Sequence, residues 1–550
     1  MLLDHYEEFS ETQLKILEKY VSNTSGHIFV LRNLPEVIKG ALFSRYSRSS
    51  LGLRSLLLKE FISNEEEAAF AAIAGKHEDE GEKDQPDQAA AIRKAQNFYD
   101  RILDGYGDDS IGELGGTHAA IENVSMLAAK LLEDSRIGGS PLEKSTRYVY
   151  FDQKVNGEYL FYREPVLMTS AYRDLYINTC NMLFDTYSRL IPPLTALIDE
   201  KMPKDPEASK AAYTAALRAK VLDCLRGLLP AGTLTNMGIY GNGRFFEQLL
   251  HKLQMSNLAE MQDIGRRLHT EISKVMPSFI RRSDPSHHTH QDMARFHGAM
   301  NAELNVVAER NIGIIPTSSQ EPGVRLIASD HDAVIKVASA LLFSHTNKSL
   351  IDLYNYCNRL SDEELARILD AGCGARENRR HKSPRALEHT NFTFEIVSDF
   401  GVYRDLHRHR MLTQERQLLC CDYGFYVPAE IIGTDLEADY LAAMHRAKEV
   451  FDAIAAELPE EAQYLVPMAY NVRWYFQVNL RALQWLCELR SSPAGHPSYR
   501  LVAQQMAKQV CEAIPAFERF FKFIDYEGYE LGRLGQEQRK IDKQMKVSAS

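Results

Sequence analysis

The chain has 550 residues, of which 45% are apolar and 25% are charged, and its formal net charge is −11. This composition is typical of a globular protein of two to four domains, and the net acidity argues against a partner such as DNA, whose non-specific binding needs a basic surface. No run of about eighteen apolar residues occurs, which argues against a membrane span.

The acidic start, MLLDHYEEFSETQ, does not resemble a signal peptide. The eight cysteines include no C-x-x-C pair, so neither a zinc ribbon nor a redox dithiol is indicated. Sparse cysteines fit a reducing compartment, and we therefore expect a cytoplasmic protein.

Helical patterns dominate the chain, with apolar residues at three- and four-residue steps in 436–458 and 500–523. Short apolar runs predict strands at HIFVL (27–31), RYVYF (147–151) and NFTFEIV (391–397). The charged stretch 71–88 is expected to be a surface loop. No regular strand–helix alternation occurs, so the predicted class is α+β, rich in long helices with small sheets.

Two distant stretches resemble each other. In RGLLPAGTLTNMGIYGNGR (226–244) and QYLVPMAYNVRWYFQVNLR (463–481), a proline precedes an N-x-R by the same spacing, at Pro230 and at Pro467. Upstream, IENVSM and LEHTNF place Glu122 and Glu388 in the same register. We interpret this as an internal duplication on a large scale.

The domain boundaries follow from the duplication. The stretch 280–323 is richer in His, Ser and Pro. We expect a first repeat with an N-terminal extension at 1–290, a connector at 291–323 and a second repeat at 324–550.

Several polar clusters are candidates for binding an anion. The guanidinium forks of Arg408 and Arg410, on either side of His409, suit phosphate or carboxylate oxygens. In an extended segment, Ser145 and Arg147 would face the same side, as a phosphate grip requires. Alone, each cluster would more often be an ordinary polar surface: a basic turn paired with Asp405 and Glu415, or a polar strand start.

A predicted helix carries a further pair. From Asn479 to Arg490 an α-helix makes about three turns, so both side chains share one face about 16 Å apart. That face suits an extended ligand, although surface arginines on a solvated helix are the alternative.

Two other features carry little functional signal. The triplet His287, His288 and His290 lies in a Pro/Ser-rich segment without a fixed scaffold, so we expect no metal site. The glycines of YGNGR (240–244) are too few for a dinucleotide-binding fingerprint.

Taken together, the pattern resembles the flavin-dependent thymidylate synthases. That family has Glu-His, then R-H-R, then a Ser and an Arg, and later a helix with N-x-R and a second Arg. LEHTNFTFEI, RHR and NLRALQWLCELR reproduce this order in the second half. The first half matches more loosely, through SPLEKSTRYV and LRGLLP.

The two halves depart from the family pattern at different places. Positions where the second half has lost the family residue are Asp405, Leu418, Cys420 and Gln463. The first half lacks R-H-R, of which only Arg136 remains, and has Leu253 in place of the second helix Arg. It keeps the residues that the second half has lost, namely Glu143, Ser145, Arg147 and Arg226.

The resemblance implies that family members are homotetramers with active sites between subunits. We therefore expect one composite site per chain, and a homodimer that mimics the tetramer. The second repeat would bind FAD through Arg408, His409, Arg410, His389, Asn479 and Arg481. The nucleotide would be held by Glu143, Ser145, Arg147, Arg226, Arg408 and Arg490, and Arg490 would be catalytic.

The implied reaction methylates dUMP to dTMP, with methylenetetrahydrofolate and NADPH as co-substrates. Two alternatives remain. One is flavin-dependent modification of another pyrimidine nucleotide, including hydroxymethylation. The other is a non-catalytic flavin- or nucleotide-binding homologue. The loss of the family residues named above supports this alternative.

Overall fold

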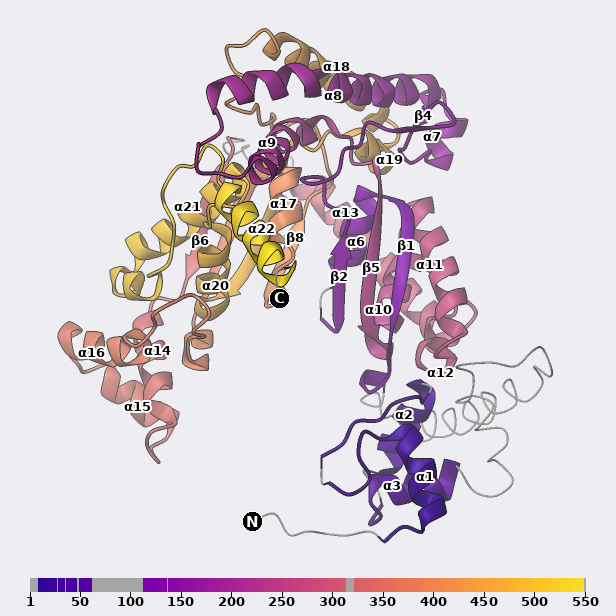
Figure 1. Ribbon diagram of the computed structural model, residues 1–550, viewed down its shortest axis with the longest axis vertical. Helices are drawn as coiled ribbons and strands as arrows, with labels where there is room; N and C mark the ends of the chain where they lie inside the picture. The colour runs from indigo at the N-terminus through magenta and orange to yellow at the C-terminus, as the bar shows by residue number, and fades with distance from the viewer. Residues whose placement is uncertain are drawn as a thin grey trace. The chain divides into compact units, whose positions relative to one another are not determined.

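The computed structural model is shown in Figure 1. It describes residues 8–26, 28–34, 36–46, 49–61, 112–135, 137–312 and 321–548. The stretch 71–88, predicted to be a surface loop, lies outside these residues, and so does Arg136. Within the described part, no helix combines the length and the apolarity that crossing a bilayer requires.

The chain forms two compact units that interleave along the sequence. Unit 1 consists of 1–122, 135–143 and 236–315, and unit 2 consists of 123–134, 144–235 and 316–550. Each unit is described by itself.

Unit 1 holds most of a three-stranded sheet of order β1-β5-β2 and a set of helices. The strands are β1 (Gly116–Ser125), β2 (Gly139–Glu143) and β5 (Leu234–Asn242), and β2 runs antiparallel to β5 with Glu143 opposite Met237. The helices are α1 (Glu11–Tyr20), α2 (Glu36–Tyr46), α3 (Leu53–Leu56), η1 (Leu57–Phe61), α10 (Gly243–Gln254), α11 (Ala259–Ser273), α12 (Pro277–Ile280), η4 (Arg281–Ser283) and α13 (His288–Asn311).

Unit 2 is built around a four-stranded antiparallel sheet of order β6-β7-β9-β8. Its strands are β6 (Gly323–Ser329), β7 (Asn391–Asp399), β8 (Leu412–Arg416) and β9 (Asn471–Asn479), and a separate hairpin pairs β3 (Lys154–Val155) with β4 (Glu158–Tyr159). Alternate residues such as Phe392, Phe394 and Phe476 are buried, because successive strand side chains face opposite sides.

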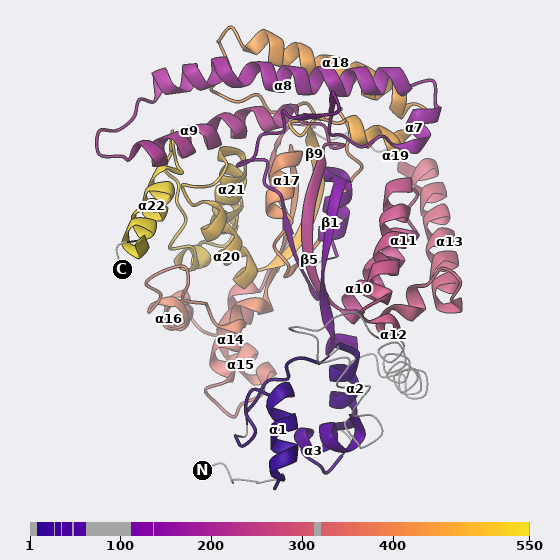
Figure 2. The ribbon, with the colours of Figure 1, turned by 45° about the vertical axis from the view of Figure 1, so that its right-hand side comes forward.

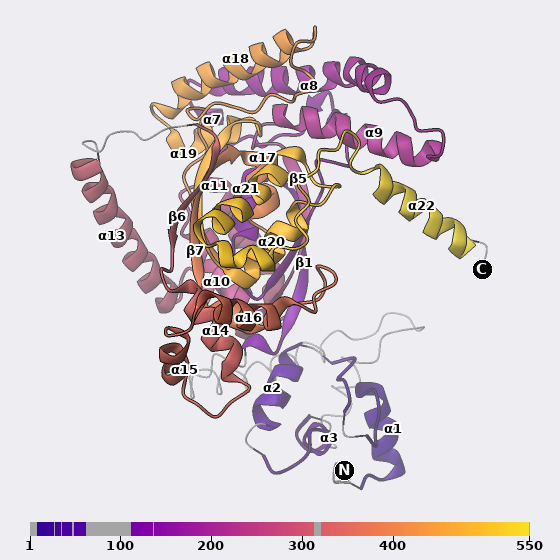
Figure 3. The ribbon, with the colours of Figure 1, turned by 90° about the vertical axis from the view of Figure 1, so that its left-hand side faces the viewer.

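Unit 2 also contains many helices. They are α6 (Met126–Glu133), α7 (Pro165–Thr169), α8 (Arg173–Lys201), α9 (Lys210–Leu225), η3 (Arg226–Leu228), α14 (Ala333–Phe343), α15 (Leu350–Cys357), α16 (Asp362–Cys373), η6 (Arg385–His389), α17 (Phe400–Leu406), α18 (Glu437–Ala455), α19 (Pro459–Ala462), η7 (Gln463–Leu465), α20 (Leu480–Arg490), α21 (Pro497–Ala513), η8 (Pro515–Phe520) and α22 (Leu534–Ser548). Of these, α17, α20 and α21 contact the four-stranded sheet. Figure 3 shows α20 and α21 over the sheet, and α21 contacts β6 and β7.

The long helices α8 and α18 lie side by side (Figure 2). Each carries a buried tyrosine whose hydroxyl donates to a backbone carbonyl earlier in the chain. The Tyr176 hydroxyl donates to the Tyr162 carbonyl at 2.7 Å, and the Tyr440 hydroxyl donates to the Tyr426 carbonyl at 3.1 Å. Such matched contacts are expected of duplicated segments.

The strand–helix junctions repeat in the same way. Ser125 caps α6 after β1, and Asp399 caps α17 after β7. Asn242 caps α10 after β5, and Asn479 caps α20 after β9, each through its side-chain oxygen. The duplication predicted from the sequence is therefore present in the fold.

Equivalent residues of the two repeats also pair with each other. Pro230 and Pro467 form an antiparallel bridge. On either side of it the Ala231 amide donates to Val466 and the Met468 amide donates to Leu229, both at 2.9 Å. Pairing of like with like is the mark of a two-fold arrangement, so the two repeats meet here as two identical subunits would.

Some expected elements differ. Because Ser125 corresponds to Asp399, Glu122 corresponds to Ile396, and the proposed register of Glu122 with Glu388 is wrong. Residues 28–30 form no strand, and only an isolated bridge joins Val21 to Leu31.

The expected helix 500–523 is shorter. It ends as α21 at Ala513, because Pro515 lacks the amide hydrogen that a continuing helix needs. The predicted helix 436–458 and strand 391–397 are confirmed as α18 and β7. Most of the stretch that we expected to be a connector, 291–323, is helical, as part of α13.

Candidate functional site

The first repeat contributes Arg147 from a turn. We expected 147–151 to be a strand, but the amides of Tyr148 and Val149 both point back to the Ser145 carbonyl, at 3.4 and 3.3 Å. The Ser145 hydroxyl accepts the Arg147 amide at 3.2 Å. A serine that bonds the backbone two residues on stabilises a turn, and this turn outweighs the strand preference of the aromatic residues.

Arg147 is buried and paired with Asp223 near the end of α9. Its Nε and Nη2 donate to the two carboxylate oxygens at 2.5 and 2.6 Å, which is the bidentate geometry of a strong ion pair. Burial alone would raise the pKa of Asp223, but the guanidinium outweighs it and lowers that pKa to about 2. For Arg147, burial opposes the charge, yet Asp223 holds its pKa above the ordinary value.

Arg226, at the start of η3, faces the second repeat. Its Nη1 donates to Asp405 near the end of α17 at 3.2 Å. Burial would raise the pKa of Asp405, but nearby cations hold it far below its usual range. Those cations are Arg226, Arg408, Arg147 and Arg490.

Asp405 is thus the centre of a cluster that we call the arginine cluster: Arg147, Arg226, Arg408 and Arg490 with Asp405, all in unit 2. Two of these arginines come from the first repeat and two from the second. The structure therefore brings together residues that are far apart in the sequence, as the composite-site hypothesis requires.

Arg490 ends α20, and its Nε donates to His409 Nε2 at 3.0 Å. His409 must accept at this nitrogen, so it is neutral with its proton on Nδ1. Burial and the adjacent Arg490 hold the pKa of His409 well below its usual value. Burial likewise lowers the pKa of Arg490.

Tyr499 lies between the guanidinium groups of the two repeats. The Arg490 Cζ is 5.6 Å from the centre of its ring and the Arg147 Cζ is 5.8 Å from it. Its hydroxyl accepts from Arg147 Nη1 at 3.3 Å. A cation over an aromatic face is attracted by the ring's electrons, so Tyr499 helps to hold two like charges near each other.

The cluster carries more positive than negative charge. Asp223 and Asp405 offset two of its four guanidinium groups. A third carboxyl, Asp399, contacts the same region, but burial raises its pKa to about 6 despite the nearby Arg226. The Nη2 of Arg226 is buried without a hydrogen-bond partner among the described residues. A buried donor of this kind is suited to an anionic ligand.

Sequence reasoning did not find all of this site. Asp223 and Tyr499 were missed, and Asp405 was noted only as a departure from the family pattern. The one available signal was the spacing of Asp223 from Arg226, which places both near one helix end. Tyr499 gave no signal, because its contact with Arg147 joins distant parts of the chain.

Of the residues expected to bind the flavin, Arg408 belongs to the arginine cluster and His409 bonds to it. The others make different contacts. The Asn479 side chain accepts the Ala482 amide at 2.9 Å. Arg481 donates to the Ser383 carbonyl and to Glu388, both at 2.7 Å. Arg410 is exposed on the segment after α17.

His389 lies on a groove between α14, α15, α16 and η6. Both apolar and polar side chains line it, among them Leu341, Phe343, His345, Arg385, Glu388 and His389. Apolar surface with polar groups that fix an orientation is typical of a cofactor site. Glu143, in contrast, belongs to β2 of unit 1.

In the second repeat, the position equivalent to Arg226 is occupied by a residue whose side chain bonds within its own repeat. Gln463 begins η7 as Arg226 begins η3, and it is buried. Its side-chain oxygen accepts from the Leu419 amide at 3.1 Å and from Arg416 at 3.4 Å. Leu418 and Cys420 stand nearby in the chain, where the family has Ser and Arg.

The histidines near 287–290 make ring contacts, His287 with His288 and His290 with His251. His251 and His290 approach at 2.8 Å between their Nδ1 atoms. In the part of the chain that the structure describes, no three His, Cys, Asp or Glu side chains are arranged to hold a metal ion.

Comparison with family models decides the relationship. The model described as thymidylate synthase complementing protein (Thy1) matches residues 57–278 and again 325–516. The chain belongs to the Thy1 family. The double match agrees with the tandem repeats, and it confirms both the predicted resemblance and the α+β class.

Two relatives of this Thy1 protein match nearly its whole length. UPF0159 proteins of Chlamydia muridarum and Thermoplasma acidophilum are 54% and 32% identical to it, over 97% and 91% of this chain and 98% of each relative. A flavin-dependent thymidylate synthase of Thermotoga neapolitana is 26% identical over 27% of this chain and 73% of its own length.

Among solved structures, a UMP/dUMP methylase PolB from Streptomyces cacaoi matches 37% of this chain and 95% of its own. The identity is 20% and the TM-score 0.29. Family membership supports a thymidylate-synthase-like nucleotide methylation.

Proposed function

We propose that this Thy1 protein methylates dUMP to dTMP at one composite site per chain, with methylenetetrahydrofolate as carbon donor and FAD reduced by NADPH. The observation that carries the proposal is the convergence of Arg147 and Arg226 with Arg408 and Arg490 around Asp405. Each repeat supplies two of these four arginines.

Arg226 and Arg147 would bind the nucleotide phosphate. The buried Nη2 of Arg226 has a donor to offer, and Arg147 is already fixed in place by Asp223. Because the Ser145 oxygen accepts an amide, its own hydroxyl proton remains available to a phosphate oxygen. Arg408 completes the proposed nucleotide contacts within unit 2.

Arg490 would lie against the pyrimidine. Its Nε bond to neutral His409 fixes the direction of the guanidinium, and burial in a site of low dielectric strengthens its field. A preorganised cation stabilises negative charge that develops as C5 of the ring becomes nucleophilic. His409 keeps its acceptor nitrogen on Arg490, so it holds Arg490 in place without moving a proton.

The groove at His389 fits a flavin, because its apolar side chains suit a flat ring and His345 and Arg385 offer bonds to polar atoms. His389, Asn479, Arg481, Arg408, His409 and Arg410 are the residues proposed to hold FAD. FAD, when bound, would supply the hydride of the reaction. Arg481 is held by Glu388 and would keep the groove's edge in position.

One observation favours a second candidate, modification of another pyrimidine nucleotide. Asp405 places a carboxylate among the cations, where it can accept a hydrogen bond from a sugar hydroxyl or a base amino group.

A tritium-release assay with dUMP labelled at C5 tests both candidates, and product analysis identifies the group that is added. The protein should also be yellow and lose its colour with NADPH. A yellow protein that is never bleached would instead support a non-catalytic binding protein. We further propose a homodimer, which sedimentation would test.

A further inference from the structure

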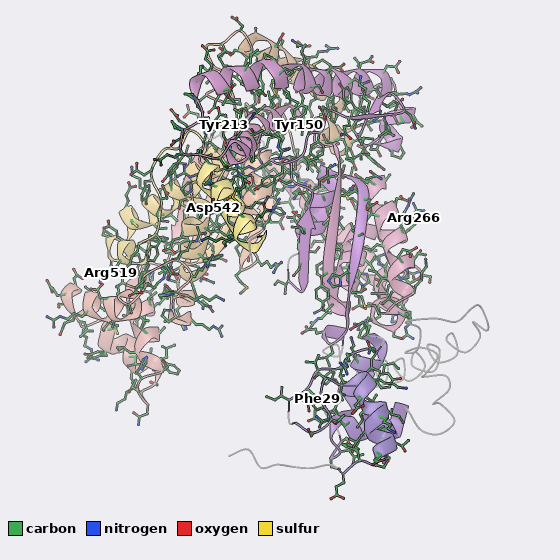
Figure 4. All side chains as sticks on the ribbon, viewed as in Figure 1. Phe29, Tyr150, Tyr213, Arg266, Arg519 and Asp542 are labelled. Carbon is green, nitrogen blue, oxygen red and sulfur yellow. The ribbon has the colours of Figure 1, made fainter. Side chains whose placement is uncertain are left out.

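The family match ends at residue 516, but the chain continues against the arginine cluster. After η8, residues 521–533 run without regular structure to α22. We call residues 521–533 the C-terminal strap. α22 then packs on α9, the helix that carries Asp223. α9 is itself tied to α8, since Tyr213, labelled in Figure 4, donates to Asp199 at 2.6 Å.

The strap is anchored to the residue after Arg490. The Asp525 amide donates to the Ser491 hydroxyl at 3.1 Å. Buried Arg500 joins the same two segments, because its Nε donates to the Ser491 carbonyl at 2.7 Å and its Nη2 to Asp525 at 3.2 Å. Tyr529 adds its ring, 5.0 Å from the Arg500 Cζ.

The end of the strap is in close contact with the loop 491–495. A Cβ on Gly532 would lie 2.1 Å from the Pro493 carbonyl oxygen, so only glycine fits there. Next to it, Arg533 Nε donates to the Ala494 carbonyl at 3.3 Å. Arg147 Nη2 reaches the same oxygen at 3.5 Å. The loop is thus held between an arginine of the first repeat and an arginine of the strap.

Arg533 is not a typical structural anchor. Its guanidinium lies over the Tyr148 ring at 4.2 Å, in the turn that presents Arg147. Its Nη1 is buried without a hydrogen-bond partner within the described residues. With Arg147, Asp223, Lys220 and Arg500 it lines a cavity of about 30 Å³, which has room for a water molecule.

We propose that the C-terminal strap is a positioning element of the nucleotide site, and that Arg533 is its positioning residue. By holding the Tyr148 turn and the loop 491–495 together, Arg533 fixes Arg147 and the end of α20, where Arg490 lies. The role of Arg533 in catalysis rests on the proposed function. Its role in holding the Tyr148 turn and the loop 491–495 together does not.

The test compares Arg533→Ala, Arg533→Lys and Gly532→Ala with a matched control, Arg539→Ala. Arg539 is an exposed arginine of α22. Hydrogen exchange of peptides covering 145–149 and 491–495 is measured on the full chain, together with KM and kcat for dUMP. Melting temperatures identify any variant that fails to fold.

We expect Arg533→Ala to speed exchange in both peptides at least tenfold and to raise KM about tenfold, with kcat reduced less. Arg533→Lys should recover part of both effects, because it keeps the charge but not the fork. Gly532→Ala should reproduce the faster exchange in 491–495. Arg539→Ala should change neither.

The inference is overturned if exchange in both peptides is the same in Arg533→Ala and in the wild type, or if Arg539→Ala has the same effects. If the wild type neither binds nor turns over dUMP, the proposed function fails, and the exchange comparison still decides whether the strap holds the two segments.

Discussion

Replacing Asp405 by asparagine should strengthen nucleotide binding and lower the free energy of unfolding of the ligand-free protein. Asp405 Oδ2 is 3.2 Å from Arg226 Nη1. A phosphate held by the same guanidinium would have its centre about 6 Å from this carboxylate. At an effective dielectric of about 20, a unit charge and a dianion at that distance repel each other by about 5 kcal/mol.

Relaxation and solvent reduce this repulsion, so we expect about 2 kcal/mol in binding, or about thirtyfold in Kd. In the absence of ligand, the same change removes a negative charge that offsets the positive charges of the four guanidinium groups. Loss of one partner from a buried ion pair typically lowers the free energy of unfolding by about 3 kcal/mol or more.

Titration calorimetry of dUMP against the wild type and Asp405→Asn measures the first effect, and urea unfolding measures the second. Deoxyuridine, which lacks the phosphate, should show no gain. Asp422→Asn is the control, because Asp422 pairs with Lys448 on the surface. Weaker binding of dUMP to folded Asp405→Asn would refute the reasoning and assign Asp405 as a direct acceptor for the ligand.

Three further predictions follow from the site. Arg490→Ala should lower kcat about a hundredfold in the tritium-release assay, the loss expected for one preorganised donor, and an unchanged kcat would contradict its role. Arg226→Gln should abolish dUMP binding in calorimetry, whereas Gln463→Ala, at the equivalent position, should leave Kd unchanged and lower the free energy of unfolding by about 1–3 kcal/mol through its lost hydrogen bonds. Folding raises the pKa of Asp399 from 3.8 to about 6, so its stabilising contribution is complete below pH 3.8 and is lost as the pH rises through 6. At pH 8, the free energy of unfolding of Asp399→Asn, measured with urea, should therefore exceed that of the wild type by about 1–3 kcal/mol. Between pH 4 and 6 this free energy should change less in the variant than in the wild type. An equal dependence on pH in the two proteins would exclude this assignment.

The sequence predicted those features that depend on local patterns. The apolar periodicity of α18 and the alternation in β7 are written in consecutive residues, and both elements are present. The equal spacing from Pro230 and Pro467 to their asparagines predicted the duplication, because each asparagine caps the helix after its strand.

The rest depends on contacts that sequence patterns do not express. Aromatic residues at 147–151 favour a strand, but hydrogen bonds to the carbonyl and the hydroxyl of Ser145 hold a turn in its place. Asp405 looked like the loss of a family residue, yet its charge is what the four cations surround. The strap was not predicted at all, because its contacts with Ser491 and Ala494 join irregular segments.

The bridge between Pro230 and Pro467 has a consequence for how this protein behaves at low concentration. Between separate subunits, such a contact dissociates as the protein is diluted. Here both sides belong to one polypeptide, which keeps each repeat near the other at an effective concentration of about millimolar. The contact of Arg147 with Tyr499 should thus survive at nanomolar protein, where an assembly of unlinked chains would come apart.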